Sequence, residues 1–209
     1  TGTNDTVSIT SGTQAGAVIE DSTTAHTQTG TIAFTDADLS DTHAATFAAA
    51  AGNTTSLGTF TLDTVAEAAN AATGSVGWTY TLDDSKAQYL AAGQQVTETY
   101  TVTVDDQHGS AKTQDVVITI TGTNDTVSIT SGSQAGAVIE DSTTAHTQSD
   151  TIAFTDADLS DGHVASVTAS PSTALGAFEL APVDEAANAA NGSVGWTYTL
   201  DDSKAQYLA

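Results

Sequence analysis

An internal repeat constrains this chain more than any other feature of its sequence. Residues 1–41 and 121–161 are identical at all but three positions, and the run GSVGWTYTLDDSKAQYLA occurs at 74–91 and again at 192–209. One copy therefore spans about 120 residues, which is enough for a domain with its own hydrophobic core. The short repeats of a solenoid, by contrast, need their neighbours to complete a core. We expect tandem domains rather than a solenoid.

The repeat boundaries predict two domains that are not equivalent. The first copy, residues 1–120, is complete, whereas the second, residues 121–209, stops before a counterpart of residues 92–120. A β-sandwich without its last strands exposes its inner face and leaves backbone edges unpaired. We therefore expect a poorly folded second domain unless the missing strands come from a longer parent chain or are donated by a neighbouring chain.

Alternation of apolar and polar residues predicts β-strands. In residues 76–83 the side chains of Val76, Trp78, Tyr80 and Leu82 share one face, opposite Gly and Thr. This period of two marks a half-buried antiparallel strand. The other candidate strands lie at 7–19 (interrupted), 31–35, 44–49, 58–62, 96–104 and 112–121, whereas helix is expected only at 66–73 and 85–90. Seven or eight strands in about 120 residues are typical of an Ig-like sandwich. The predicted fold class is all-β, with tandem Ig-like or cadherin-like antiparallel β-sandwiches.

Composition excludes several functions. With 3 Lys+Arg against 26 Asp+Glu, the net charge is −23, so nucleic acid and anionic membrane surfaces are poor partners. The absence of Cys excludes disulfide scaffolds, thiolate zinc sites and thiol nucleophiles. No apolar run is long enough for membrane insertion.

The carboxylates are concentrated between the predicted strands. In the first copy, 10 of the 14 acidic residues fall in five clusters, namely Asp5, Glu20 with Asp21, Asp36 with Asp38 and Asp41, Asp83 with Asp84, and Asp105 with Asp106. In a sandwich of this strand order, residues 36–41 and 105–106 share the pole where the chain begins, with Asn4 and Asp5. We name this the N-pole. Residues 20–21 and 83–84 share the opposite C-pole.

The interdomain junction is predicted to bind calcium. The C-pole of the first copy, the linker residues Asn124 and Asp125, and the second-copy residues Asp156, Asp158 and Asp161 meet there in the sequence-based arrangement. Like charges about 5 Å apart repel by roughly 1 kcal/mol even in water. Ca²⁺ takes several hard oxygen ligands in flexible geometry. The candidate ligands are Asn4, Asp5, Glu20, Asp21, Asp36, Asp38, Asp83, Asp84, Asp105, Asn124, Asp125, Asp156 and Asp158. The alternative is that these acidic loops are merely solvated.

Several motifs together resemble a known family. They are VIED at 18–21, DAD at 36–38, GWTYTLD at 77–83, VTVDDQHG at 102–109 and ITITGTND at 118–125. This combination is similar to the VCBS-type, cadherin-like repeats of large bacterial surface adhesins.

The resemblance implies stacked β-sandwiches in long secreted proteins that act in adhesion and biofilm formation at the bacterial cell surface. It implies neighbouring identical repeats, in the same or an adjacent chain, as partners. By similarity to cadherins, the junction ligands are Glu20, Asp83/Asp84, Asn124/Asp125 and Asp156/Asp158. The sequence Asp-Asp-Ser replaces the cadherin Asp-Arg-Glu at residues 83–85, which leaves the number of ions per junction open.

The sequence gives weaker support for other functions. His26, His43 and His108 are interpreted as surface residues, and nothing positions a Ser/His/Asp triad, so we expect no enzymatic activity. Trp78 and Trp196 lie on inward faces and are assigned to the core rather than to a sugar platform. The main alternative function is a carbohydrate- or protein-binding module that uses the variable segment 44–73 (164–191 in the second copy).

Overall fold

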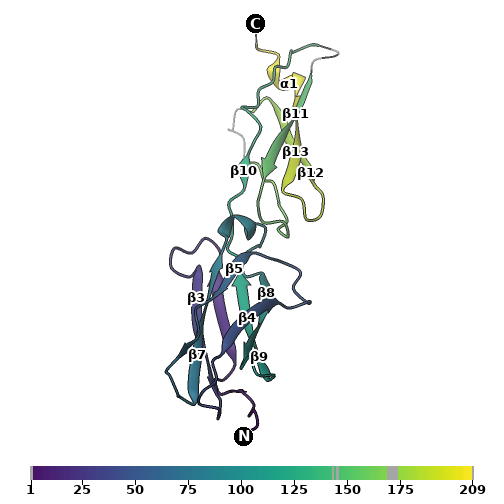
Figure 1. Ribbon diagram of the computed structural model, residues 1–209. Helices are drawn as coiled ribbons and strands as arrows, with labels where there is room; N and C mark the ends of the chain where they lie inside the picture. Colours follow the sequence, from purple (N-terminus) through teal and green to yellow (C-terminus); the bar gives the residue numbers. More distant parts are fainter. Residues whose placement is uncertain (1, 143, 145, 169–173, 209) are drawn as a thin grey trace. The chain divides into compact units, whose positions relative to one another are not determined.

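The chain forms two compact units in the computed structural model. Unit 1 is Thr1–Thr123 and unit 2 is Asn124–Ala209, so the division falls three residues after the repeat boundary in the sequence. The structure describes residues 2–142, 144, 146–168 and 174–208. Figure 1 labels most of the strands of both units, and each unit is treated by itself below.

Unit 1 consists of two β-sheets. The first has the order β1 (Ser8–Ile9), β3 (Thr27–Thr35), β7 (Thr73–Leu82) and β5 (Gly58–Leu62), with β6 (Ala66–Glu67) also paired to β7. The second has the order β2 (Gln14–Ile19), β9 (Ala111–Thr121), β8 (Gln95–Asp105) and β4 (Ala44–Ala49). All pairs are antiparallel except β2 with β9. The interrupted strand expected at 7–19 therefore contributes one piece to each sheet, and the all-β fold class is confirmed.

The core of unit 1 lies between the inner faces of these sheets. Trp78 and Tyr80 of β7 are 2% and 0% exposed, and Val102 of β8 and Ile118 of β9 are fully buried. The alternation that predicted these strands therefore also identified their inward faces. The Trp78 indole N–H donates to the side-chain oxygen of Gln14 at 2.9 Å, so its assignment to the core is confirmed.

A buried carboxylate lies within this apolar core. Glu98 of β8 is 0% exposed. Its two oxygens accept hydrogen bonds from the Leu57 amide (2.6 Å) and from the hydroxyls of Thr55 (3.0 Å), Tyr80 (3.0 Å) and Tyr100 (2.8 Å). Burial, and then the Glu98 charge, raise the pKa of Tyr80, so its hydroxyl stays protonated as a donor. Four donors thus compensate the cost of burying one charge.

The expected helix at 66–73 is wrong. Ala66–Glu67 form the short strand β6, which pairs with Ser75 and Gly74, and Asn70 adopts a positive φ of 58° in the following turn. The alanine-rich composition favours helix, but edge pairing to β7 prevails. At 85–90, only a 3₁₀ turn, η1 (Asp84–Lys86), forms.

Unit 2 reproduces the first sheet of unit 1. Its order is β10 (Ser128–Ile129), β11 (Thr147–Thr155), β13 (Asn191–Leu200) and β12 (Gly176–Glu185), followed by the one-turn helix α1 (Asp202–Ala205). Residues 134–139 and 164–168, which correspond to β2 and β4, form no strand. In the described part of unit 2, therefore, no second sheet covers the first.

Candidate functional site

The N-pole of unit 1 holds a continuous chain of polar contacts. The Asp5 amide donates to the Asp38 carboxylate (2.6 Å), and the Asp38 amide donates to the Asp36 carboxylate (3.0 Å). The other Asp36 oxygen faces His43 Nε2 at 3.3 Å, and His43 Nδ1 contacts Glu67 at 2.7 Å. The segment before β1, the loop between β3 and β4, and the strand β6 thus position five residues as one network.

Unit 2 builds the same network from the second copy. The Asp125 amide donates to Asp158 (2.8 Å), and the Asp158 amide donates to Asp156 (3.1 Å). His163 then contacts Asp156 at 2.9 Å and Glu185 at 2.7 Å. The N-pole network is therefore a repeated feature of the domain rather than an accident of one loop.

The sequence suggested that the histidine of this network, His43, is a surface residue. The structure shows that this interpretation is wrong. The side chain of His43 is 3% exposed and packs 4.7 Å from the Phe34 ring. In unit 2, hydrogen bonds to Asp156 and then to Glu185 raise the pKa of His163. A protonated imidazole between two carboxylates offsets part of their mutual repulsion. Each N-pole thus carries a histidine that holds its buried aspartate in place.

Other N-pole acids fasten the turn between β8 and β9. Asp106 is fully buried and accepts hydrogen bonds from the Asn4 side chain (3.0 Å) and from the amides of His108 (2.8 Å) and Ser110 (2.9 Å). Asp105 accepts from the Gln107 amide at 2.6 Å. Asn4 and Asp105, both expected as metal ligands, therefore make structural contacts within this turn.

These contacts predict a pH-dependent stability. The Asn4 side chain first, and then the Ser110, His108 and Gly109 amides, lower the pKa of Asp106 from 3.8 to about 2. Since the folded-state pKa is depressed, the stabilisation is complete above pH 3.8 and is lost as pH falls through about 2. Asp106→Asn should thus destabilise unit 1 at neutral pH, and its difference from the parent should shrink in this acidic range. Urea unfolding at a series of pH values measures this. A difference independent of pH would contradict the assignment, and Asp115→Asn is the control.

The C-poles also repeat between units. Asp21 adopts a positive φ of 54°, and its amide donates to Asp84 at 2.8 Å. Gln88 donates to the Asp21 carboxylate at 3.0 Å, and His26 lies 3.2 Å from Asp84. The same contacts join the counterpart residues Asp141, Asp202, Gln206 and His146.

Two further predicted ligands have separate surroundings at the C-pole. Glu20 is 0% exposed, and one of its oxygens accepts the Thr123 amide at 3.0 Å. Asp83 accepts from the Ser85 hydroxyl at 2.7 Å and faces Lys86 at 3.4 Å, and both contacts lower its pKa. The contacts of Asp83 are therefore made within the turn that directly follows it.

The donor set fits calcium in chemistry, although its side chains are not gathered around one point. Carboxylate and amide oxygens are the hard ligands that Ca²⁺ prefers. Among the residues that the structure describes, no group of three or more His, Asp or Glu is arranged to hold a metal ion. Beside the unit 2 network lies an open hollow of about 330 Å³, lined in part by Asn124, Asp125, Asp156 and Asp161. Binding there would require these side chains to converge.

Comparisons with known proteins give fold-level likenesses alone. No protein-family model and no curated protein matches the chain. Among the solved structures that resemble it are the cadherin-like domains 1 to 4 of zebrafish RET, with 11% identity and a TM-score of 0.35 over 97% of this chain and 45% of that one. Another is the secreted serine protease VesC from Vibrio cholerae, with 10% identity and a TM-score of 0.30 over 94% of this chain and 47% of that one. The chain spans less than half the length of either. At such TM-scores these likenesses carry no functional argument.

None of the helices in the described residues combines the length and the apolar character that a membrane crossing requires.

Proposed function

We propose that this chain is a non-catalytic structural or adhesive module of a secreted bacterial surface protein or fibre, in which Ca²⁺ at the acidic poles stiffens consecutive repeats. Its partners in this proposal are neighbouring copies of the same repeat. Unit 1 is a two-sheet sandwich with acidic residues at both ends, which is the arrangement that such a spacer needs.

The repeated N-pole network is the observation that supports this proposal most. The chain from Asp5 through Asp38 and Asp36 to His43 is matched contact for contact by Asp125, Asp158, Asp156 and His163. The two copies differ most in sequence over 44–73 and 164–191. The N-pole contacts are therefore the same in both copies although the sequence of this neighbouring segment differs.

Calcium is preferred over magnesium for a chemical reason. Mg²⁺ demands compact octahedral geometry and gives up its waters reluctantly, whereas Ca²⁺ accepts six to eight oxygens in irregular arrangements. Carboxylates on loops, with amide and backbone oxygens nearby, therefore suit Ca²⁺ better than Mg²⁺. In each N-pole network the histidine already occupies one oxygen of the first aspartate, Asp36 or Asp156. Asp38 and Asp158, which the histidines do not contact in this way, are therefore the better candidates for ion contact.

Calorimetric titration of the full chain tests the metal proposal. We expect saturable Ca²⁺ binding that weakens at least tenfold in the double variant Asp38→Asn, Asp158→Asn, because each substitution removes a negative ligand. Asn keeps an oxygen that can accept the Asp5 or Asp125 amide, so the loops should stay folded. Asp115→Asn, on the exposed face of β9, is the matched control. Equal Ca²⁺ binding by the double variant and the control, or none by the parent, would contradict the proposal.

A second candidate function is recognition of a glycan or protein through the variable segment. Phe47 of β4 is 43% exposed and lies within this segment, and the two copies differ most here. Binding on a glycan array that is lost with Phe47→Ala would favour recognition over a spacer role.

A further inference from the structure

An early and a late strand of unit 1 run side by side at the edge of one sheet. β2 pairs with β9 in parallel over six residues, from Gln14 opposite Val116 to Ile19 opposite Thr121. The other strand pairs described in unit 1 are antiparallel. The chain therefore enters this pair at the N-pole end of β2 and leaves it at the C-pole end of β9.

Further hydrogen bonds extend this pairing beyond both ends of β2. At the N-pole, the Val7 amide donates to the Ser110 hydroxyl at 3.2 Å, directly before β9 begins. At the C-pole, the Glu20 amide donates to the Thr121 carbonyl at 3.0 Å, and the Glu20 carboxylate accepts the Thr123 amide at 3.0 Å. Val7 and Glu20 are both 0% exposed, and hydrogen bonds are stronger where water is excluded. The pairing is therefore closed at each end by a buried residue.

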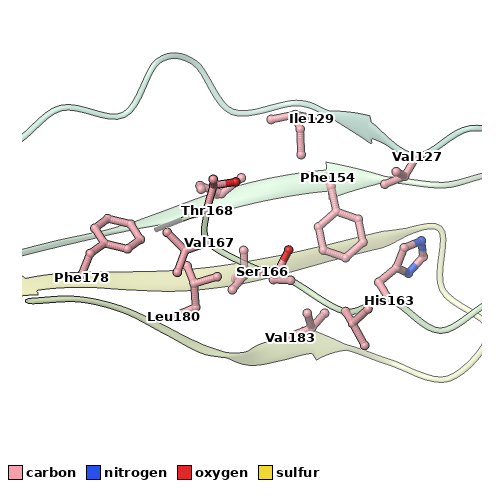
Figure 2. Close-up of a pocket in the computed structure, with 14 residues that line it drawn as sticks. Val127, Ile129, Phe154, His163, Ser166, Val167, Thr168, Phe178, Leu180 and Val183 are labelled. Carbon is pink, nitrogen blue, oxygen red and sulfur yellow. The ribbon is translucent and has the colours of Figure 1, made fainter. Parts of the chain in front are cut away.

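Unit 2 shows how far β2 depends on β9. Residues 134–139 have the sequence of β2, yet without a partner like β9 among the described residues they form no strand. The apolar face that β9 helps to cover in unit 1 lines an open groove in unit 2, and Figure 2 shows Phe154 and Leu180 along it. The strand structure of β2 therefore comes from its bonds to β9.

A pull on the two ends of unit 1 acts along this pair of strands. The N-terminal side draws β2 toward the N-pole, while the C-terminal side draws β9 toward the C-pole. The inter-strand hydrogen bonds of a parallel ladder are evenly spaced, so all of them are loaded together when the strands are drawn past each other. A pull across the strands, by contrast, opens the bonds one after another.

We propose that residues 7–20 and 110–123 form a shear clamp, which carries load between the ends of unit 1 and keeps residues 21–109 folded under tension. The proposal deepens the spacer function and rests on it, because a spacer within a fibre is pulled at both ends. It needs no cation, since the bonds that carry the load are hydrogen bonds within unit 1.

Single-molecule force spectroscopy of the full chain in chelator tests the clamp by comparing two pulling directions. The chain contains no Cys, so introduced cysteines give unique attachment points. With cysteines added at the two ends of the chain, we expect one high-force event for unit 1. It should release up to about 400 Å, the extended length of residues 7–123. Unit 2, whose described residues include no such strand pair, should extend without a high-force event.

The second direction pulls across the same strands. Gly12→Cys and Thr113→Cys place both attachments at the N-pole end of the pair. Both positions are exposed, and a side chain at Gly12 meets no atom within 4 Å. The high-force event should be lost in this direction. Equal unfolding forces in the two directions, or no high-force event from the chain ends, would overturn the clamp. Because chelator is present, either result would leave the calcium proposal standing.

A matched pair of variants separates load-bearing bonds from other stabilising bonds. Ser110→Ala removes the acceptor of the Val7 amide at one end of the clamp. Asn53→Ala removes two hydrogen bonds to the backbone of Thr99, outside the clamp, and should lower stability in urea at least as much. Forced unfolding is governed by the unfolding rate rather than by equilibrium stability, so only Ser110→Ala should lower the unfolding force. Equal unfolding forces of the two variants would contradict the clamp.

Discussion

Replacing Glu98 by Ala should lower the free energy of unfolding of unit 1 by about 3–5 kcal/mol, the combined cost expected for unsatisfied buried donors and a cavity in the core. The substitution leaves the Leu57 amide and the hydroxyls of Tyr80 and Tyr100 without their acceptor in the core. Each orphaned buried donor costs about 1–3 kcal/mol, and the lost side chain adds a cavity.

Denaturation of the full chain in a Trp196→Phe background, followed through Trp78 fluorescence, measures this change. Glu98→Gln keeps one acceptor oxygen and the shape of the side chain, so it should cost distinctly less than Ala. Asp115→Asn, on the exposed outer face of β9, should change stability by less than about 0.5 kcal/mol. Equal effects of the Ala and Gln variants would contradict this account, because they would show that loss of the carboxylate itself sets the cost, rather than lost volume or the number of unsatisfied donors.

Much of the fold was predictable because the inward residues alternate so regularly. The strand expected at 58–62 coincides with β5, and those at 96–104 and 112–121 lie within one residue of β8 and β9. The strand β3 begins four residues earlier than expected, at Thr27. The first four residues of β3, at 27–30, include no large apolar side chain. They form strand because they pair with residues 78–81 of β7. Periodicity therefore located the buried parts of strands better than their polar ends.

The N-pole network was only partly predictable. The DAD sequence at 36–38 placed two carboxylates correctly at the pole, but the role of His43 escaped notice because its partner Glu67 lies on the two-residue strand β6. A signal was nevertheless present. Glu67 recurs as Glu185 at the start of the run EAANAA, which is identical at 67–72 and 185–190 within the variable segment. A run retained within a variable segment indicates fixed contacts, whereas an isolated strand of two residues leaves no periodicity to detect.

The second unit shows what sequence identity alone does not determine. Residues 14–19 and 134–139 are identical, yet only the first stretch is a strand. The difference arises because β2 pairs with β9, a long-range partner that the described residues of unit 2 do not include. Local propensity for β-structure is strongly context-dependent, so a strand that exists through its partner cannot be inferred from its own residues.

Calcium should produce the largest change in the mechanical properties of the chain. A ligand that binds only the folded, ordered state stabilises it by about 2.7 kcal/mol at a hundredfold excess over its Kd. At the poles that stabilisation acts on carboxylates that otherwise repel one another in a chain of net charge −23. We therefore expect Ca²⁺ to extend and stiffen the chain, and Mg²⁺ to do so weakly.

A cation titration followed by small-angle X-ray scattering tests this central claim most directly. At constant ionic strength, which fixes general charge screening, the maximum dimension of the full chain should rise with Ca²⁺, saturate, and return to its starting value on chelation. The double variant Asp125→Ala, Asp156→Ala should remain short in Ca²⁺ while its β-type circular dichroism is unchanged. Scattering curves that superimpose in Ca²⁺ and in chelator would contradict a calcium-stiffened spacer.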